Sequence, residues 1–174
     1  MKHIVLVFVM LLSIGLSPNL VCAADSYVLP YPSLLPGNKF YSISQLWESA
    51  ERFWYFGDFG QITFTLKLAD KYLVEAKTLF EYEQYLLGYN ALQKSNLYFS
   101  QLPTLLSSAQ LHGKRIAEFD SKIKNAAKKH NEELERIKQE IPEAFLWSPE
   151  YSPPQNLLLH KEIDRAITIR GKVF

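Results

Sequence analysis

The stretch LKLADKYLVEAKTLFEYEQYLLGYNALQKSNLYF, residues 66–99, contains two helical apolar patterns separated by a short polar and aromatic connection. Apolar side chains spaced three and four residues apart predict one helix over about 61–80 and another over about 82–101. Because the connection at 80–84 is short, we expect the two helices to form an antiparallel hairpin. The positions that carry the pattern are Phe64, Leu66, Leu68, Tyr72, Leu73, Ala76, Leu79 and Phe80 in the first helix and Tyr85, Leu86, Tyr89, Leu92, Leu97 and Phe99 in the second.

An aromatic amphipathic segment precedes this hairpin. Ser42 or Ser44 can cap its first turn, and the pattern ends near residues 56–60, where Gly57 and Gly60 interrupt it. We therefore expect a first helix with one apolar face. That face consists of Ile43, Leu46, Trp47, Ala50 and Trp54.

A long helix is expected after the hairpin. Pro103 suits the first turn of a helix, and Pro142 ends the pattern, so the predicted helix covers about 104–140. Apolar residues recur every seven positions on it, which is typical of coiled-coil packing, and this seam could also bring copies of the chain together. The seam contains Ile116, Ile123, His130 and Ile137.

The segments on either side of the predicted helices differ from them in composition. Residues 27–41, YVLPYPSLLPGNKFY, contain three prolines that exclude a helix and favour extended backbone. Residues 147–154 read as a loop, and 155–169 could form a last helix. Together the patterns predict an all-α, antiparallel three- to four-helix bundle at 42–141 with one long helix. An extended proline-rich segment at 24–41 precedes the bundle, and a tail follows at 142–174.

Residues 1–23 have the layout of a secretory signal peptide. A basic start with Lys2 is followed by the apolar run IVLVFVMLLSIGL at 4–16, and Val21-Cys22-Ala23 resembles a signal-peptidase site. The run is shorter than the roughly 20 residues that span a bilayer. The alternatives are an uncleaved membrane anchor, a buried core helix and lipid attachment at Cys22, although Asn19 and Val21 fit a lipoprotein signal poorly. We expect an exported protein that is periplasmic, cell-surface or extracellular, in a bacterial envelope or outside it.

Composition narrows the classes of function. The chain has 19 Lys and Arg against 18 Asp and Glu, and loss of Lys2 with the signal would make the mature chain formally neutral. A nucleic-acid-binding domain needs a basic excess, so nucleic acid is not an expected partner. Cys22 is the single cysteine. A chain cleaved after Ala23 could therefore form no disulfide and would offer no thiol for catalysis or metal binding.

The proline-rich segment and the hairpin together resemble a bacterial exported family that is classed only as a domain of unknown function. Its members open with Leu-Pro-x-Pro-Gly-x-Leu-Pro-Asp-x-Pro-x-Tyr and continue with Leu-x-x-Ala-x-x-Arg-Leu-x-Glu-Ala on a helical hairpin. Ser33, Gly37, Lys39 and Tyr72 depart from the usual Gly, Asp, Pro and Arg. The resemblance covers about residues 27–100 and implies an exported helical module without an assigned activity. The matching positions are Leu29, Pro30, Pro32, Leu35, Pro36, Tyr41, Leu66, Ala69, Leu73, Glu75 and Ala76.

No motif in the sequence indicates a catalytic, cofactor or metal site. His112, His130 and His160 occur in neither Glu-x-x-His nor His-Glu-x-x-His patterns. Asp58-Phe59-Gly60 spells the metal-binding triplet of kinases, but the other kinase motifs are missing, so it is interpreted as a turn. The glutamates near residue 133 lie among lysines and are expected to be a solvated surface. We therefore predict no catalytic residues, no cofactor and no metal.

The concentration of aromatic residues between 47 and 64 is the most unusual feature of the composition. It is explained either by core packing, where aromatic rings bury large areas, or by an exposed patch that contacts a partner. The function we expect is a non-catalytic interaction or scaffold module that binds a protein or itself. The alternatives are a ligand-binding protein or enzyme whose site assembles only in three dimensions, and a peripheral membrane-surface protein. The candidate contact residues are Trp47, Trp54, Tyr55, Phe56, Phe59, Ile116, Ile123 and Ile137.

Overall fold

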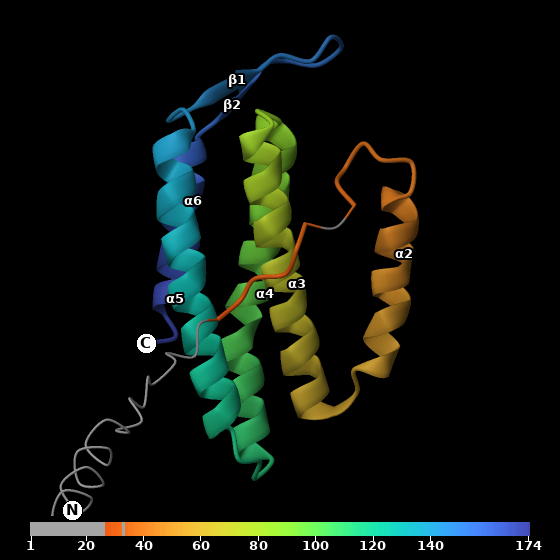
Figure 1. Ribbon diagram of the computed structural model, residues 1–174, viewed down its shortest axis with the longest axis vertical. Helices are drawn as coiled ribbons and strands as arrows, with labels where there is room; N and C mark the ends of the chain where they lie inside the picture. Colours follow the sequence, from red (N-terminus) through yellow and green to blue (C-terminus); the bar gives the residue numbers. More distant parts are fainter. Residues whose placement is uncertain (1–26, 33) are drawn as a thin grey trace, which may run out of the picture.

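A computed structural model describes residues 27–32 and 34–174 of the chain. The predicted signal peptide and Cys22 lie outside the described residues. Of the described residues, 70% are helical, and a small two-stranded hairpin lies between the last two helices. Figure 1 shows α3, α4, α5 and α6 side by side as a bundle, with the proline-rich segment crossing α3 and α2 standing on the outer side of α3. The predicted helical bundle is confirmed.

The hairpin predicted from residues 66–99 forms the centre of the bundle. α3 covers Gly57–Glu81 and α4 covers Tyr85–Leu111. The connection turns tightly because Glu83 adopts a positive φ of 58° and the amide of Gln84 donates to the carbonyl of Leu79 at 2.8 Å. Gly88 allows the helices to approach, since a Cβ there would lie 2.7 Å from the Phe80 ring. The antiparallel pairing is as the sequence predicted.

The single long helix predicted over 104–140 is wrong. Pro103 lies inside α4, which continues to Leu111, and α5 begins only at Ala117 and ends at Glu140. The break is at Gly113, whose φ of 71° is unfavourable for residues with a Cβ. The amide of Lys114 donates to the carbonyl of Ala109 at 3.0 Å, which ends α4 in the usual manner of a glycine-terminated helix.

The tail belongs to the bundle. Strands β1, Phe145–Trp147, and β2, Gln155–Leu157, pair antiparallel, with Phe145 opposite Leu157. The last helix, α6, covers Leu159–Gly171 and packs on α4 and α5. The helix proposed over 155–169 therefore starts four residues later, because β2 occupies its first positions. The buried side chains of α6 are Leu159, Glu162, Ile163, Ala166 and Arg170.

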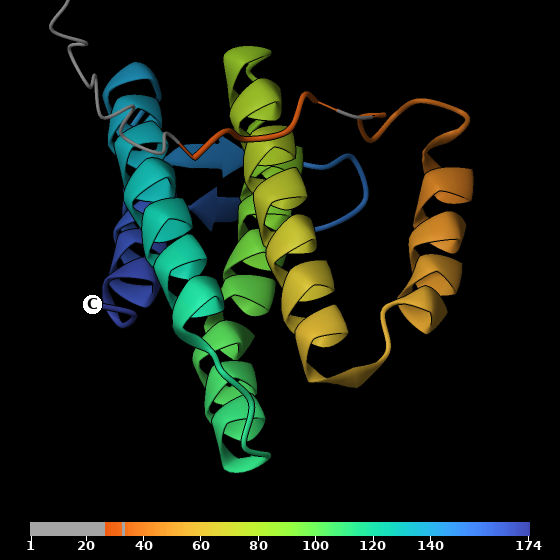
Figure 2. The same ribbon diagram turned by 60° about the horizontal axis from the view of Figure 1, so that its bottom comes forward.

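The first helix lies outside the core. α2 covers Tyr41–Glu51 and continues into a 3₁₀ turn, η1, at Arg52–Trp54. None of its residues is buried, and Figure 2 shows it on the side of α3 opposite α5. The apolar face predicted from its sequence therefore does not enter the core. Over the described part of the chain, no helix is both long and apolar enough to cross a membrane.

Candidate functional site

A layer of buried polar side chains crosses the middle of the bundle. Arg170 of α6 is fully buried and uses most of its guanidinium donors. Its Nε donates to His130 Nδ1 at 2.9 Å, one Nη donates to Asn96 Oδ1 at 2.7 Å, and the other donates to Ser95 Oγ at 2.7 Å. The Phe99 ring lies under the guanidinium at 5.0 Å. The layer thus joins α4, α5 and α6 through one side chain.

The hydrogen bonds of this layer assign the tautomer of His130. Because Nδ1 accepts from Arg170, the ring proton lies on Nε2, which donates to Asp70 Oδ1 at 2.7 Å. The other carboxylate oxygen of Asp70 accepts from the Tyr27 hydroxyl at 2.5 Å. The chain of contacts therefore runs from the N-terminal segment, through α3 and α5, to α6.

Burial controls the charges in the layer. Complete burial is the main reason that the pKa of His130 falls to about 4, and the nearby charge of Arg170 acts in the same direction. Burial also lowers the pKa of Arg170, to about 9, which still leaves the guanidinium charged at neutral pH. His130 is thus a neutral bridge between the carboxylate of Asp70 and the cation of Arg170. His130 and Arg170 have no exposed surface, so the centre of the layer is enclosed by the bundle.

The histidines do not assemble into a site. His112 is exposed and pairs with Asp58 at 3.0 Å, whereas His160 contacts the carbonyl of Ile141 at 3.1 Å. His130 is enclosed in the buried layer. Across residues 27–32 and 34–174, no three His, Cys, Asp or Glu side chains are grouped closely enough to hold a metal ion.

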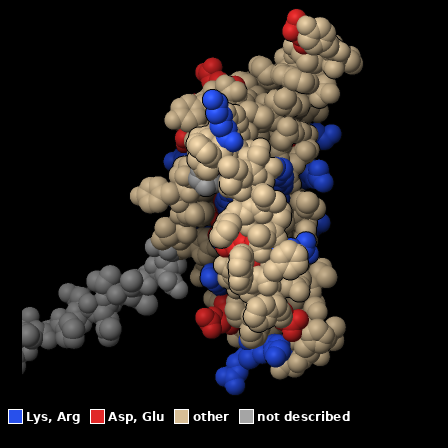
Figure 3. All heavy atoms as spheres, turned by 90° about the vertical axis from the view of Figure 1, so that its right-hand side faces the viewer, with Lys and Arg blue, Asp and Glu red and all other residues tan. Residues whose placement is uncertain are grey.

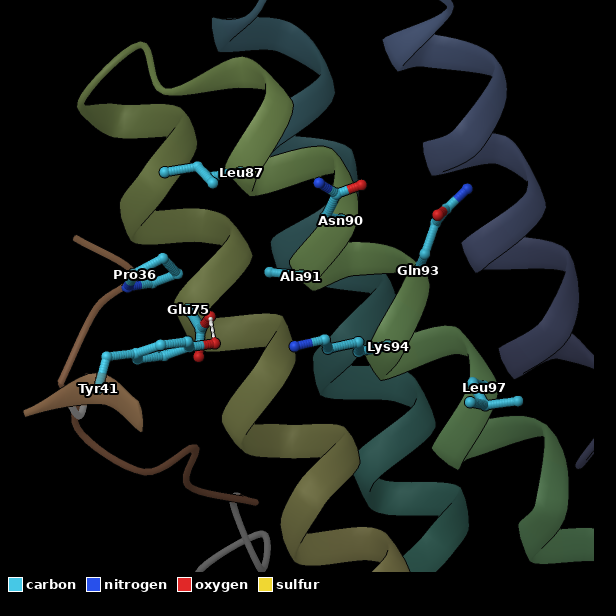
Figure 4. A pocket seen from close by; sticks show the side chains of 9 residues that line it. All are labelled: Pro36, Tyr41, Glu75, Leu87, Asn90, Ala91, Gln93, Lys94 and Leu97. Atoms are coloured by element: carbon cyan, nitrogen blue, oxygen red, sulfur yellow. Dashed lines mark hydrogen bonds between the residues drawn. The ribbon is translucent and has the colours of Figure 1, made fainter. Parts of the chain in front are cut away.

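An open groove of about 480 Å³ lies between the start of α2 and the α3–α4 hairpin. In Figure 4, Tyr41 reaches Glu75 of α3 while Lys94 of α4 points toward the same carboxylate. The Tyr41 hydroxyl donates to Glu75 Oε1 at 2.8 Å, and Glu75 Oε2 is buried without a hydrogen-bond partner among the described residues. Burial raises the pKa of Glu75, against the opposing effects of the Tyr41 hydrogen bond and of the nearby lysines. The hydrogen bond between Tyr41 and Glu75 in this groove therefore attaches the start of α2 to the bundle.

The polar face of α2 is turned toward the bundle. Glu48 accepts a hydrogen bond from Tyr72 at 2.9 Å and forms an ion pair with Lys71, and Glu51 pairs with Lys67. These glutamates share the side of α2 that Tyr41 occupies, because Glu48 is seven residues after Tyr41 and Glu51 is three after Glu48, spacings that keep residues on one face of a helix. Polar contacts to α3 thus hold α2 in place.

The apolar side chains of α2, η1 and Phe56 consequently point to solvent, and we call them the outer apolar face. Trp47 and Trp54 lie with ring centroids 5.9 Å apart and are 63% and 62% exposed. In Figure 3, which looks at α2, uncharged side chains cover most of this side, with atoms of both Lys or Arg and Asp or Glu above and below. The outer apolar face contains Ile43, Leu46, Trp47, Phe53, Trp54 and Phe56.

The structure separates the contact residues predicted from the sequence. Three of them, Trp47, Trp54 and Phe56, are exposed on the outer apolar face. The remaining aromatic residues pack inside, Tyr55 on Phe64 at 5.2 Å and Phe59 on Phe119 at 4.5 Å. The predicted surface seam is part of the interior: Ile123 and Ile137 are 1% and 2% exposed, and Ile116 packs against the same core as Ile123.

Two groups of residues were missed by sequence reasoning. Ile43 and Leu46 belong to the predicted apolar face and Phe53 to the aromatic concentration, but none was named as a contact residue, because periodicity identifies an apolar face but not the direction in which it points. The buried polar layer was missed because its members are distant in sequence. The available signal was that Asp70, Asn96 and His130 interrupt otherwise apolar stripes.

These features define a small helical bundle protein with a closed polar layer and one outward-facing amphipathic helix. The chain belongs to a family described as a domain of unknown function, DUF5667, whose profile matches residues 33–144. The match includes α2 to α5 and ends just before β1. Neither a curated protein nor a solved structure matches the chain.

Proposed function

We propose that this protein is a non-catalytic binding module that works outside the cytoplasm, with the outer apolar face as its contact surface. The observation that supports the proposal is the inverted orientation of α2. An amphipathic surface helix normally buries its apolar face against the core, whereas this one contacts α3 through Tyr41, Glu48 and Glu51. The extracytoplasmic location rests on the signal-like sequence of residues 1–23.

The size of the outer apolar face favours a binding role over incidental exposure. An aromatic side chain offers about 150–250 Å², and four such side chains on this face are each more than 60% exposed. Together with Ile43 and Leu46 they exceed the roughly 300–600 Å² that is usual for the largest apolar patch of a monomer. Burying one such side chain contributes about 1.5–3 kcal/mol. A partner that covers the face therefore gains a substantial apolar contact.

Photo-crosslinking within the cell envelope tests this proposal. A benzophenone amino acid at Trp47 or Phe53 is expected to form adducts in cells that export the protein. Leu146 and Tyr151 are matched control positions, because they are 62% and 89% exposed on the β1–β2 hairpin, away from α2. Adduct yields at positions 47 and 53 no higher than at 146 and 151 would contradict the proposal.

A further inference from the structure

We infer that the outer apolar face docks on the headgroup region of a phospholipid bilayer that contains anionic lipids. This inference rests on the proposed function and identifies the partner of the same surface. Three observations support it: the charges around the face, the kinds of side chain on it, and the exposed cations on the neighbouring turn between α4 and α5.

Two exposed cations without ion-pair partners in the described part of the chain border the outer apolar face. Lys39 precedes α2 and Arg52 begins η1, and both are exposed. Neither has an ion-pair partner among the described residues. The two acids of this helix, Glu48 and Glu51, are turned inward to lysines of α3. An approaching surface therefore meets apolar groups between two cations, which complements anionic headgroups.

The turn between α4 and α5 adds positive charge at the Arg52 end. His112 on this turn contacts Asp58 at the start of α3, so the two turns lie at one end of the bundle. The turn also exposes Lys114, Arg115 and the apolar side chain of Leu111, which is 87% exposed. Glu118, in the first turn of α5, is an exposed acid nearby. Asp58 and Asp120 lie at the same end and pair with His112 and Lys124. Among the described residues, Lys114 and Arg115 therefore face one acid, Glu118, that has no ion-pair partner.

The side chains on the outer apolar face are those of helices that lie in a membrane interface. Such helices bury Trp, Phe and Leu side chains about 5–10 Å into the boundary between headgroups and acyl chains. Phe53 and Phe56 are 83% and 82% exposed at the end of η1, where they can enter the acyl region. Trp47 and Trp54 have amphipathic rings that favour the headgroup level.

A second copy of the chain fits this face less well. The area of the outer apolar face approaches the roughly 800 Å² per partner of a stable interface, so self-association is the main alternative to membrane binding. A two-fold axis, however, would bring Lys39 and Arg52 of one copy close to cations of the other in either helix orientation. The acids that could compensate are already paired within each bundle. Lipid phosphates supply the missing anions.

Vesicle flotation tests the inference with residues 24–174, which contain all the described helices and the whole described core. The probes are vesicles of phosphatidylcholine alone and vesicles with a third of phosphatidylglycerol. We expect flotation with the anionic vesicles, and an at least tenfold lower partition coefficient for F53S/F56S and for K39E/R52E. The matched controls L146S/Y151S and K161E/K172E change equally exposed residues elsewhere and should bind like the parent chain.

Tryptophan fluorescence provides a second readout. The chain has three tryptophans, so the variant W147F leaves only Trp47 and Trp54, and their emission should shift to shorter wavelength on anionic vesicles. No flotation and no shift would overturn the lipid inference. If, in addition, light scattering shows dimers that F53S/F56S abolishes, a second copy is the partner and the proposed contact surface stands. If crosslinking at 47 and 53 also stays at control levels, the proposed function fails as well.

Discussion

At the scale of single residues, the middle of the bundle depends on compensating the buried charge of Arg170. A buried charge is costly unless it is compensated, and the guanidinium of Arg170 is compensated by Asp70 through the neutral ring of His130. Removal of either partner would leave an uncompensated group between two apolar clusters. The layer therefore specifies one arrangement of α3, α5 and α6, because other registers would separate these groups.

His130 makes the stability of the fold depend on pH. Its pKa is about 4 in the folded state, against 6.5 for an unperturbed imidazole. Because the folded-state pKa is depressed, the unfolded chain binds more protons between these values, and stability falls as the pH drops from about 6.5 to 4. His130 is expected to lower the free energy of unfolding by about 3 kcal/mol over this pH range. Urea unfolding at pH 7 and pH 4 measures it.

Comparison with His130→Gln isolates this contribution, since glutamine keeps hydrogen-bonding groups and does not titrate. We expect the variant to be less stable at pH 7 but to lose about 3 kcal/mol less than the parent chain on acidification. His112→Gln is the matched control, because His112 is exposed. If the stability of the parent chain and that of His130→Gln depend on pH equally, the loss on acidification does not come from His130.

At the scale of elements, the sequence predicted where helices occur better than where they end. The α3–α4 hairpin follows from local spacing, which is why it was predicted correctly. The break between α4 and α5 was misplaced because proline at 103 was interpreted as a start signal. α4 instead accommodates Pro103 within its length, while the actual end depends on the backbone conformation of Gly113.

Gly113 offers a test of this explanation. A Cβ at this position would meet no atom within 4 Å, so Gly113→Ala introduces only the strain of a positive φ. We expect a loss of about 1–2 kcal/mol in the free energy of unfolding. Gly171→Ala is the matched control, because a Cβ there is equally free of contacts and the backbone has no positive φ. If both variants unfold at the same urea concentration, the explanation that α4 ends because position 113 requires a positive φ is contradicted.

The orientation of α2 marks the limit of what periodicity can predict. Its apolar stripe was identified correctly, and the usual rule assigns such a stripe to the core. The opposite outcome depends on Tyr72, Lys71 and Lys67, which bind the glutamates of α2 from α3. These partners are 16 to 24 residues away in sequence. Only three-dimensional contacts could reveal that the exposed side is the apolar one.

At the scale of the whole molecule, two apolar clusters lie on either side of the polar layer. One cluster includes Leu73 and Leu92 and extends to α6, and the other includes Phe99 and Ile123. The sequence predicted a tail at 142–174 with a possible helix over 155–169, but its periodicity does not show where that helix packs. Its contribution became visible only when α6 was placed against α4 and α5.

Removing the tail should therefore unfold the protein, even though the family match ends at residue 144. A chain of residues 24–144 lacks Leu159, Ile163 and Arg170, so Asp70 would lose its compensating cation and one cluster would be open to water. Each exposed Leu or Ile costs about 1.5–3 kcal/mol, and total stabilities are only about 5–15 kcal/mol. We expect no cooperative thermal transition in circular dichroism. A chain ending at Val173, which lacks only the exposed Phe174, should melt like the parent, and a cooperative transition for residues 24–144 would show that α6 is dispensable for folding.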